Sequence, residues 1–200
     1  MKFLYFAAWI VNIGFLVWSG NLLVKIQSMG SETPELHQQS LELDALASAW
    51  RDLNRPGNDV LENYEVEAQR EALASYRQRY DATHAGFYQR VRDDDVLEPL
   101  ISSLEPARDG LVDLAEQVLT LSEQRETLRL AEAQAELISE KETAAASAMA
   151  RMDQTFQDGL DLILQASAVV VGHERELEEL QRENFQRLYV ILLVTLLVSA

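Results

Sequence analysis

Apolar side chains recur at alternating spacings of three and four residues over most of the segment 36–184. This spacing places them on one face of an α-helix. Four such stripes begin at Leu36, Val66, Leu111 and Met149. No stretch shows a sustained two-residue alternation, so no β-sheet is expected. The pattern predicts an all-α fold in which four helices form an up-down-up-down bundle.

Three breaks separate the predicted helices. The segment 54–59 contains Pro56 and Gly57, and it is expected to end the first helix because proline removes a donor and disfavours helix at the preceding residue. The acidic run 93–95 is expected to end the second helix and begin the third. The segment 139–142 has the pattern of a capping box, which predicts the last turn there.

Both ends of the chain are apolar and almost uncharged. The first run, Phe3 to Val24, would be about 33 Å long as a helix, which matches the roughly 30 Å hydrocarbon core of a bilayer. A cleaved signal peptide is the alternative, but no A-x-A-like site follows the run. The second run, Leu188 to Ala200, is too short to span and stops in mid-pattern. This favours a chain truncated within a second transmembrane helix over a short hydrophobic tail.

These runs divide the chain into three predicted regions. Residues 1–25 form an uncleaved transmembrane helix, 26–187 form an extracytoplasmic helical-bundle domain, and 188–200 begin a second transmembrane helix. The first and last bundle helices are expected to be continuous with the two transmembrane helices, because no helix breaker separates them.

Charge is concentrated in the middle of the chain and is strongly acidic. The 200 residues carry 33 acidic and 17 basic side chains. With Lys2 and Lys25 excluded, the segment 26–187 keeps 15 basic and all 33 acidic residues, a net charge of −18. Because phosphate contacts need clustered lysine and arginine, nucleic acid is excluded as a partner.

The sequence offers no catalytic constellation, so no enzyme activity, cofactor or metal is expected. It has no cysteine, no glycine-rich phosphate loop and no Gly-x-Ser-x-Gly turn. Its histidines, His37, His84 and His173, lie on different predicted helices with no carboxylate at a zinc-motif spacing. His84 lies one turn from Tyr80 and Tyr88, which favours packing against these rings.

Two sets of residues are candidates for binding a small ligand. The first surrounds the predicted turn Leu53–Val60, which would lie at the membrane-distal tip; the set is Trp50, Asn54, Asn58, Asp59 and Tyr64. Ordinary turn and capping chemistry explains the same residues without a ligand. The second set is Arg125 and His173, polar residues on apolar stripes. Arg125 could hold an anionic group between helices; register control or a partly wet groove is the plainer explanation.

The chain resembles the periplasmic sensor regions of bacterial transmembrane receptors. These include methyl-accepting chemotaxis proteins, sensor histidine kinases and diguanylate cyclases. The resemblance rests on two apolar ends around an acidic helical segment, and on the string Leu53-Asn54-x-Pro56-Gly57-Asn58-Asp59-Val60. It implies a four-helix bundle, a homodimer, and a small-molecule ligand or periplasmic binding protein as partner. It also implies a location in the bacterial inner (cytoplasmic) membrane, with the bilayer as partner and 26–187 in the periplasm.

Two functions remain open from the sequence. The first is the ligand-sensing input domain of a two-component or chemotaxis receptor, in which a ligand shifts the packing of the fourth helix and slides the second span. Its output module is absent from this chain. The second is a membrane-anchored helical scaffold or interaction protein of the cell envelope with no signalling output.

Overall fold

The computed structural model describes the backbone of residues 2–63, 65–131 and 134–199. The described residues form five α-helices and no strand, which confirms the predicted all-α fold. The helices are α1 (Lys2–Asn63), α2 (Val66–Val91), α3 (Leu97–Ser102), α4 (Leu104–Leu130) and α5 (Ala135–Ser199).

The chain divides into two compact units. One unit, called the core unit here, is Ser40–Val169. The other, called the paired-end unit, combines Met1–Gln39 with Val170–Ala200. Helices α1 and α5 contribute to both units, whereas α2, α3 and α4 belong to the core unit alone.

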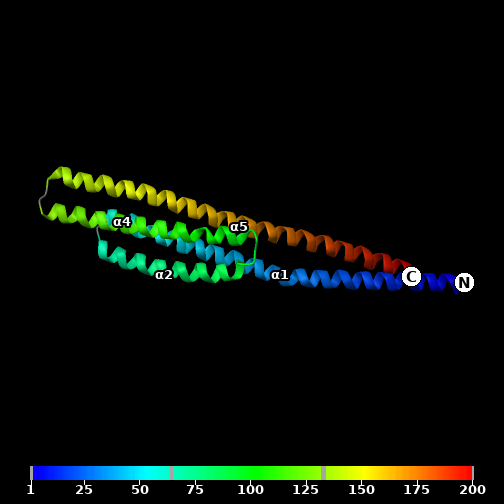
Figure 1. Ribbon diagram of the computed structural model, residues 1–200. Helices are drawn as coiled ribbons and strands as arrows, with labels where there is room; N and C mark the ends of the chain where they lie inside the picture. The colour runs from blue at the N-terminus through cyan, green and yellow to red at the C-terminus, as the bar shows by residue number, and fades with distance from the viewer. Residues whose placement is uncertain (1, 64, 132–133, 200) are drawn as a thin grey trace. The chain divides into compact units, whose positions relative to one another are not determined.

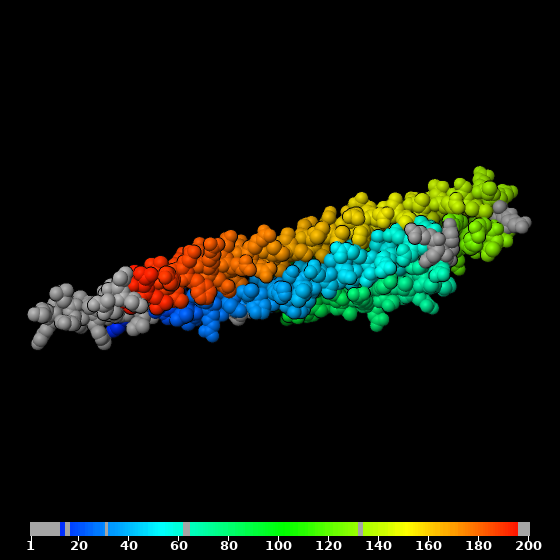
Figure 2. All heavy atoms as spheres, turned by 180° about the vertical axis from the view of Figure 1, so that it is seen from behind, coloured from blue at the N-terminus to red at the C-terminus, as the bar shows by residue number. Residues whose placement is uncertain are grey.

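Four helical segments lie alongside one another in the core unit (Figure 1). The end of α1 contacts α2 through the rings of Trp50 and Tyr80, whose centroids are 5.6 Å apart. The same end contacts α5 through the Trp50 indole. Helix α5 contacts α4 through a hydrogen bond from Arg151 to Gln117 at 3.0 Å. Figure 2 shows the 40–61 part of α1 between α5 and α2.

The apolar stripes read from the sequence form the core of this unit. Each of the four segments contributes some side chains that are less than 2% exposed, because its apolar stripe faces the other helices. The largest are Trp50, Tyr80, Phe87, Leu43, Leu46, Leu53, Leu73, Leu97, Ile101, Leu104, Leu111 and Leu119.

The turn between α2 and α3 lies where the acidic run predicts it. The side chain of Asp94 accepts hydrogen bonds from the backbone N–H groups of Val96 and Leu97, at 2.9 and 2.8 Å. Two of the unpaired N–H groups at the start of α3 thereby gain an acceptor. The third helix of the sequence prediction consists of two helices, because α3 ends at Ser102 and α4 begins at Leu104.

The predicted turns at 54–59 and 139–142 are wrong. Helix α1 runs through Pro56 to Asn63, and α5 begins at Ala135, several residues before the predicted capping box. Ser139 instead sits inside α5, where its carbonyl accepts a hydrogen bond from the Thr143 hydroxyl at 2.9 Å. The alanine-rich sequence around 144–150 favours helix, and the capping-box pattern at 139–142 lies inside α5 and does not mark a helix start.

The paired-end unit consists of one stretch of α1 and one stretch of α5. Among the side chains that the structure describes here, the buried ones are few and are spaced by seven: Leu22 and Met29 on α1, and Val170, Leu177, Asn184 and Ile191 on α5. Asn184 donates from its side-chain amide to Met29 Sδ at 3.5 Å. Seven-residue spacing of buried positions is typical of two helices that pack as a coiled coil.

Among the described residues, no helix holds a stretch long and apolar enough to cross a membrane. A span needs about 20 consecutive apolar residues. The finding contradicts the predicted location in the bacterial inner membrane.

Candidate functional site

The first set of predicted ligand residues does not surround a turn. Trp50, Asn54, Asn58 and Asp59 all lie within α1, and Tyr64 lies outside the described residues. Trp50 is fully buried, so its indole is not available to a ligand at the surface. Asn54, Asn58 and Asp59 are half-buried.

Local packing explains why α1 continues through Pro56. The carbonyl that loses its helical donor at Pro56 is that of Asp52, and the rest of the segment stays helical: two residues further on, the side-chain amide of Asn58 donates to the carbonyl of Asn54 at 3.1 Å. Pro56 and Gly57 are both buried. A β-carbon at Gly57 would lie 2.6 Å from Met152 Sδ, so glycine serves close helix packing here and not a turn.

Arg125, the strongest candidate of the second set, lies in a hollow between helices. Its side chain on α4 is 14% exposed, and its guanidinium lies 3.9 Å from a carboxylate oxygen of Glu142 on α5. The hollow has a volume of about 460 Å³. Besides Arg125 it is lined by Leu61 of α1 and by six residues of α5: Glu142, Ala145, Ala146, Met149, Ala150 and Asp153.

The hollow combines charges of both signs with a small apolar surface. Arg125 supplies one positive charge, and Glu142 and Asp153 supply two negative charges, so the lining is net acidic. An arginine can bind a carboxylate or phosphate through two parallel hydrogen bonds. The two carboxylates would repel a purely anionic molecule. The alanines and Met149 leave room for a short apolar group.

His173 belongs to a different unit from Arg125. It is exposed on α5 in the paired-end unit, where it lines a hollow of about 280 Å³ with Glu32, Glu35, Leu36, Gln39 and Leu177. The structure therefore does not assemble Arg125, His173 and the α1 residues into one site. The stripe position of His173 is at the surface, because only one neighbouring helix contacts α5 in this unit.

A buried aromatic row crosses the middle of the core unit. The ring of His84 stacks on Tyr80 and Tyr88, with centroids 5.6 and 6.1 Å apart, as the four-residue spacing predicts. His84 Nε2 lies 2.9 Å from the carbonyl oxygen of Ile101, which makes it the donor of that hydrogen bond. This row packs α2 against α3.

Two tyrosines of this row have raised pKa values, for different reasons. Burial raises the pKa of Tyr80 well above its ordinary value, and its hydroxyl has no hydrogen-bond partner among the described residues. The hydroxyl of Tyr88 donates to Glu98 at 3.1 Å, and this hydrogen bond raises the pKa of Tyr88. Arg108 forms an ion pair with Asp81 of α2 close to Tyr80.

No three histidine, cysteine or carboxylate side chains among the described residues are grouped so that they could hold a metal ion. The chain matches no protein-family model, no curated protein and no solved structure. The hollow at Arg125 and the packing around it are therefore the features from which a function can be inferred.

Proposed function

We propose that the chain is the ligand-sensing input part of a signal-transduction receptor. In this proposal α1, α2, α4 and α5 of the core unit act as an up-down-up-down four-helix bundle. A small molecule binds in the hollow at Arg125 and changes the packing of α5. The observation that carries the proposal is the hollow itself, because three helices contribute to it and α5 supplies most of its lining.

The contacts of the hollow support a coupling between ligand and helix packing. Arg125 of α4 and Glu142 of α5 lie 3.9 Å apart, so the distance between these two charges depends on the spacing of the two helices. A ligand that carries both an anionic and a cationic group would bond to both side chains. It would thereby bind best to one spacing of α4 and α5 and increase the population of that spacing.

The length of α5 supports a route for the signal. Helix α5 runs from Ala135 to Ser199 without a break, so residues in both units belong to one hydrogen-bonded helix. A change in the packing of its first half is therefore passed along the same helix into the paired-end unit. In the proposal a kinase, cyclase or chemotaxis module reads this change.

The test is a thermal-shift screen of the full chain against small metabolites that carry both charges, followed by calorimetric titration of each hit. Arg125→Ala should weaken binding by about 10- to 100-fold, because a hydrogen bond to a charged group contributes about 1.5–3 kcal/mol. The matched control is Arg129→Ala, one turn further along α4, where the side chain is 69% exposed and pairs with Glu126. Hits that bind equally to the wild-type and Arg125→Ala proteins contradict the assignment.

A second candidate function is a helical interaction protein without signalling output. It is favoured by large apolar side chains that are exposed in the paired-end unit, such as Trp18, Phe185 and Tyr189. The homodimer implied by the receptor resemblance would use the same surface. Sedimentation of the full chain over a range of concentrations tests it: a chain that stays monomeric at high concentration contradicts a homodimer.

A further inference from the structure

Helices α1 and α5 meet in the core unit through a tryptophan that covers a glycine. The Trp50 indole is fully buried and donates from Nε1 to the carbonyl of Phe156 at 2.9 Å. A β-carbon built on Gly159 would lie 2.6 Å from Cε2 of that indole. No side chain larger than hydrogen therefore fits at 159 while the ring stays where it is.

A second contact of the same kind lies seven residues away, with the roles of the helices exchanged. Here α1 supplies the glycine and α5 supplies the large side chain. A β-carbon at Gly57 would lie 2.6 Å from Met152 Sδ and 2.8 Å from its Cε. Met152 is fully buried, but its flexible thioether end can shift at lower cost than the Trp50 ring, so Trp50–Gly159 is the stronger of the two contacts.

The two contacts together define how far along α1 each residue of α5 lies. Trp50 is level with Gly159, and Gly57 is level with Met152. A slide of one heptad, about 10.5 Å at 1.5 Å per residue, brings Trp50 level with either Met152 or Ala166. The first slide opposes two large side chains. The second opposes Gly57 and Gly159, which leaves a void between the helices.

A shorter slide is also unfavourable because of the Trp50 hydrogen bond. A displacement of one turn, about 5.4 Å, separates the indole N–H from the Phe156 carbonyl. A buried N–H without an acceptor costs about 1–3 kcal/mol. The ring would at the same time leave the space above Gly159 and meet the side chains of the adjacent turn.

We propose that Trp50–Gly159 and Gly57–Met152 form a latch that fixes the register of α5 against α1 in the core unit. With the latch closed, α5 does not slide along α1. One consequence rests on the proposed function. A ligand at Arg125 changes the rotation or tilt of α5 while the latch keeps the position of α5 along α1 unchanged. The sliding mechanism expected from the sequence is replaced by this one.

Two glycine-to-alanine substitutions, one at the latch and one away from it, should shift the midpoint of thermal unfolding in opposite directions. Gly159→Ala should lower the midpoint of thermal unfolding by roughly 3–8 °C, because the new methyl group displaces the Trp50 ring. Gly86→Ala is the matched control, since Gly86 is also inside a helix and nothing lies within 4 Å of its β-carbon position. This control should raise the midpoint by about 1–3 °C.

The double variant shows whether the effect of Gly159→Ala comes from the ring. In a Trp50→Phe background the smaller ring leaves room for the methyl group, so Gly159→Ala should lose at least about half of its effect. If Gly159→Ala stabilises the chain as Gly86→Ala does, or is unaffected by Trp50→Phe, there is no latch at this position.

Pulsed electron paramagnetic resonance measures the register directly. The chain has no cysteine, so spin labels can be placed on cysteines introduced at chosen exposed positions. One label replaces Arg55, and the other replaces Ser147, Gln154 or Asp161, which are one heptad apart on α5. The latch predicts a single narrow distance distribution for each pair, with the shortest mean for 55 with 154. A shorter mean for either other pair, or two populations, overturns the proposal.

The latch and the proposed function can fail separately. A correct register with no hit in the metabolite screen leaves the latch intact and contradicts ligand sensing at Arg125. Confirmed ligand binding that shifts the shortest distance from position 154 to 147 or 161 supports sensing and contradicts the latch.

Discussion

Helices α1 and α5 take part in both units of the molecule, but they pack very differently in each. In the core unit they bury Trp50, Leu53 and Ile163 against neighbours on several sides. In the paired-end unit the residues that they bury are fewer and one heptad apart, and large side chains such as Phe185 and Tyr189 are more than half exposed.

The difference follows from the number of neighbouring helices. A helix that contacts two or three others buries a wide stripe, because residues at several positions of each turn face a partner. A helix that contacts one other buries only a narrow seam. The same pair of helices is therefore held firmly in the core unit and weakly in the paired-end unit. We expect their register to be fixed in the core unit.

Removing one tryptophan from each unit tests this comparison with the largest expected effect. Trp50→Ala should lower the free energy of unfolding by about 3–5 kcal/mol, because it deletes a large buried side chain and its hydrogen bond. Trp18→Ala should change it by less than about 1 kcal/mol, since the Trp18 side chain is 53% exposed. Urea unfolding followed by circular dichroism measures both. Equal losses would mean that the two units are packed equally well.

Alkaline pH tests the burial of the core unit through Tyr80. Its pKa is raised above its ordinary value of 10.0, mainly by burial. The folded state therefore holds the phenolic proton more tightly than the unfolded state. This contribution is fully present below pH 10 and is lost as the pH rises through the folded-state pKa.

The measurement is the unfolding free energy as a function of pH on both sides of pH 10, for the wild-type and Tyr80→Phe proteins. The wild type should lose more stability above pH 10 than the variant. Below pH 10 the variant should be as stable as the wild type or slightly more so, because the Tyr80 hydroxyl has no described hydrogen-bond partner. Parallel pH curves would show that Tyr80 is accessible to water.

Asn184 offers a way to strengthen the paired-end unit. It is 3% exposed, and the one described partner of its side-chain nitrogen is the weak acceptor Met29 Sδ. Asn184→Leu should raise the unfolding free energy by about 1 kcal/mol, because polar residues on a helix seam reduce stability in exchange for a defined register. Asn21→Leu, at an exposed position on α1, is the control and should change little. A loss of stability in Asn184→Leu would show that the amide makes a stronger bond.

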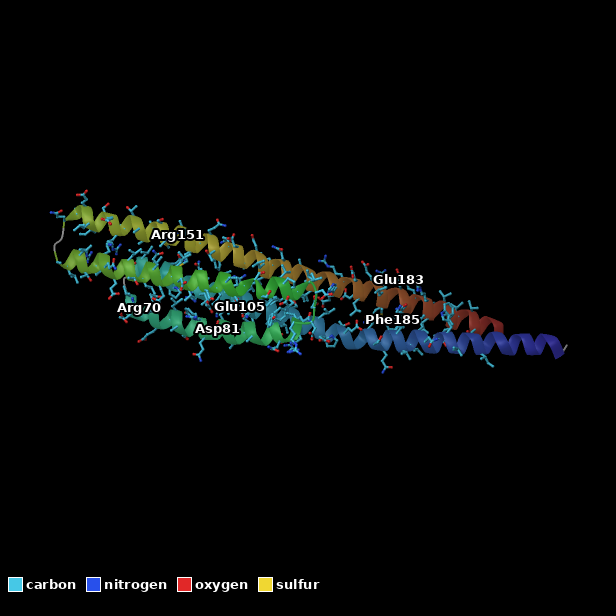
Figure 3. The ribbon with its side chains drawn as sticks, in the orientation of Figure 1. Arg70, Asp81, Glu105, Arg151, Glu183 and Phe185 are labelled. Atoms are coloured by element: carbon cyan, nitrogen blue, oxygen red, sulfur yellow. The ribbon has the colours of Figure 1, made fainter. Side chains whose placement is uncertain are left out.

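The smallest effect is expected from the ion pairs on the surface of the core unit. Arg70 on α2, labelled in Figure 3, forms ion pairs with Glu67, Glu116 and Glu123 at 2.7, 3.6 and 3.1 Å. The hydrogen bond to Glu123 is the main cause of its raised pKa. Arg70→Ala should cost about 0.5–1 kcal/mol in dilute buffer and less at about 1 M salt. A cost that does not depend on salt would point to packing by the arginine stem.

Helical periodicity and the acidic break at 93–95 were sufficient to predict the all-α fold and part of the core. The stripe positions Leu43, Leu46, Trp50 and Leu53 are all buried. The spacing of these apolar residues follows the helix repeat, and the tertiary packing of the helices stabilises the same helical conformation. The stacking of His84 between two tyrosines follows from the same repeat.

The errors of prediction arose where a local signal competed with packing. Pro56-Gly57 has strong turn propensity, but Gly57 permits the close approach of Met152, and burial of Pro56 and Val60 keeps the segment helical. His173 and Leu180 lie on an apolar stripe, but they are exposed because no second helix covers that side of α5. The register of α1 against α5, which opposes Trp50 to Gly159, depends on two residues 109 positions apart, and no local pattern specifies it.

Hydrogen exchange of the full chain, followed by mass spectrometry, tests most directly the claim that α1 and α5 are held firmly in one unit and weakly in the other. Peptides that cover 43–53 and 152–166 should exchange only with global unfolding. Those that cover 22–29 and 177–191 should exchange at least about 100-fold faster through local opening. Equal protection along both helices, or slower exchange in the paired-end unit, would contradict the claim.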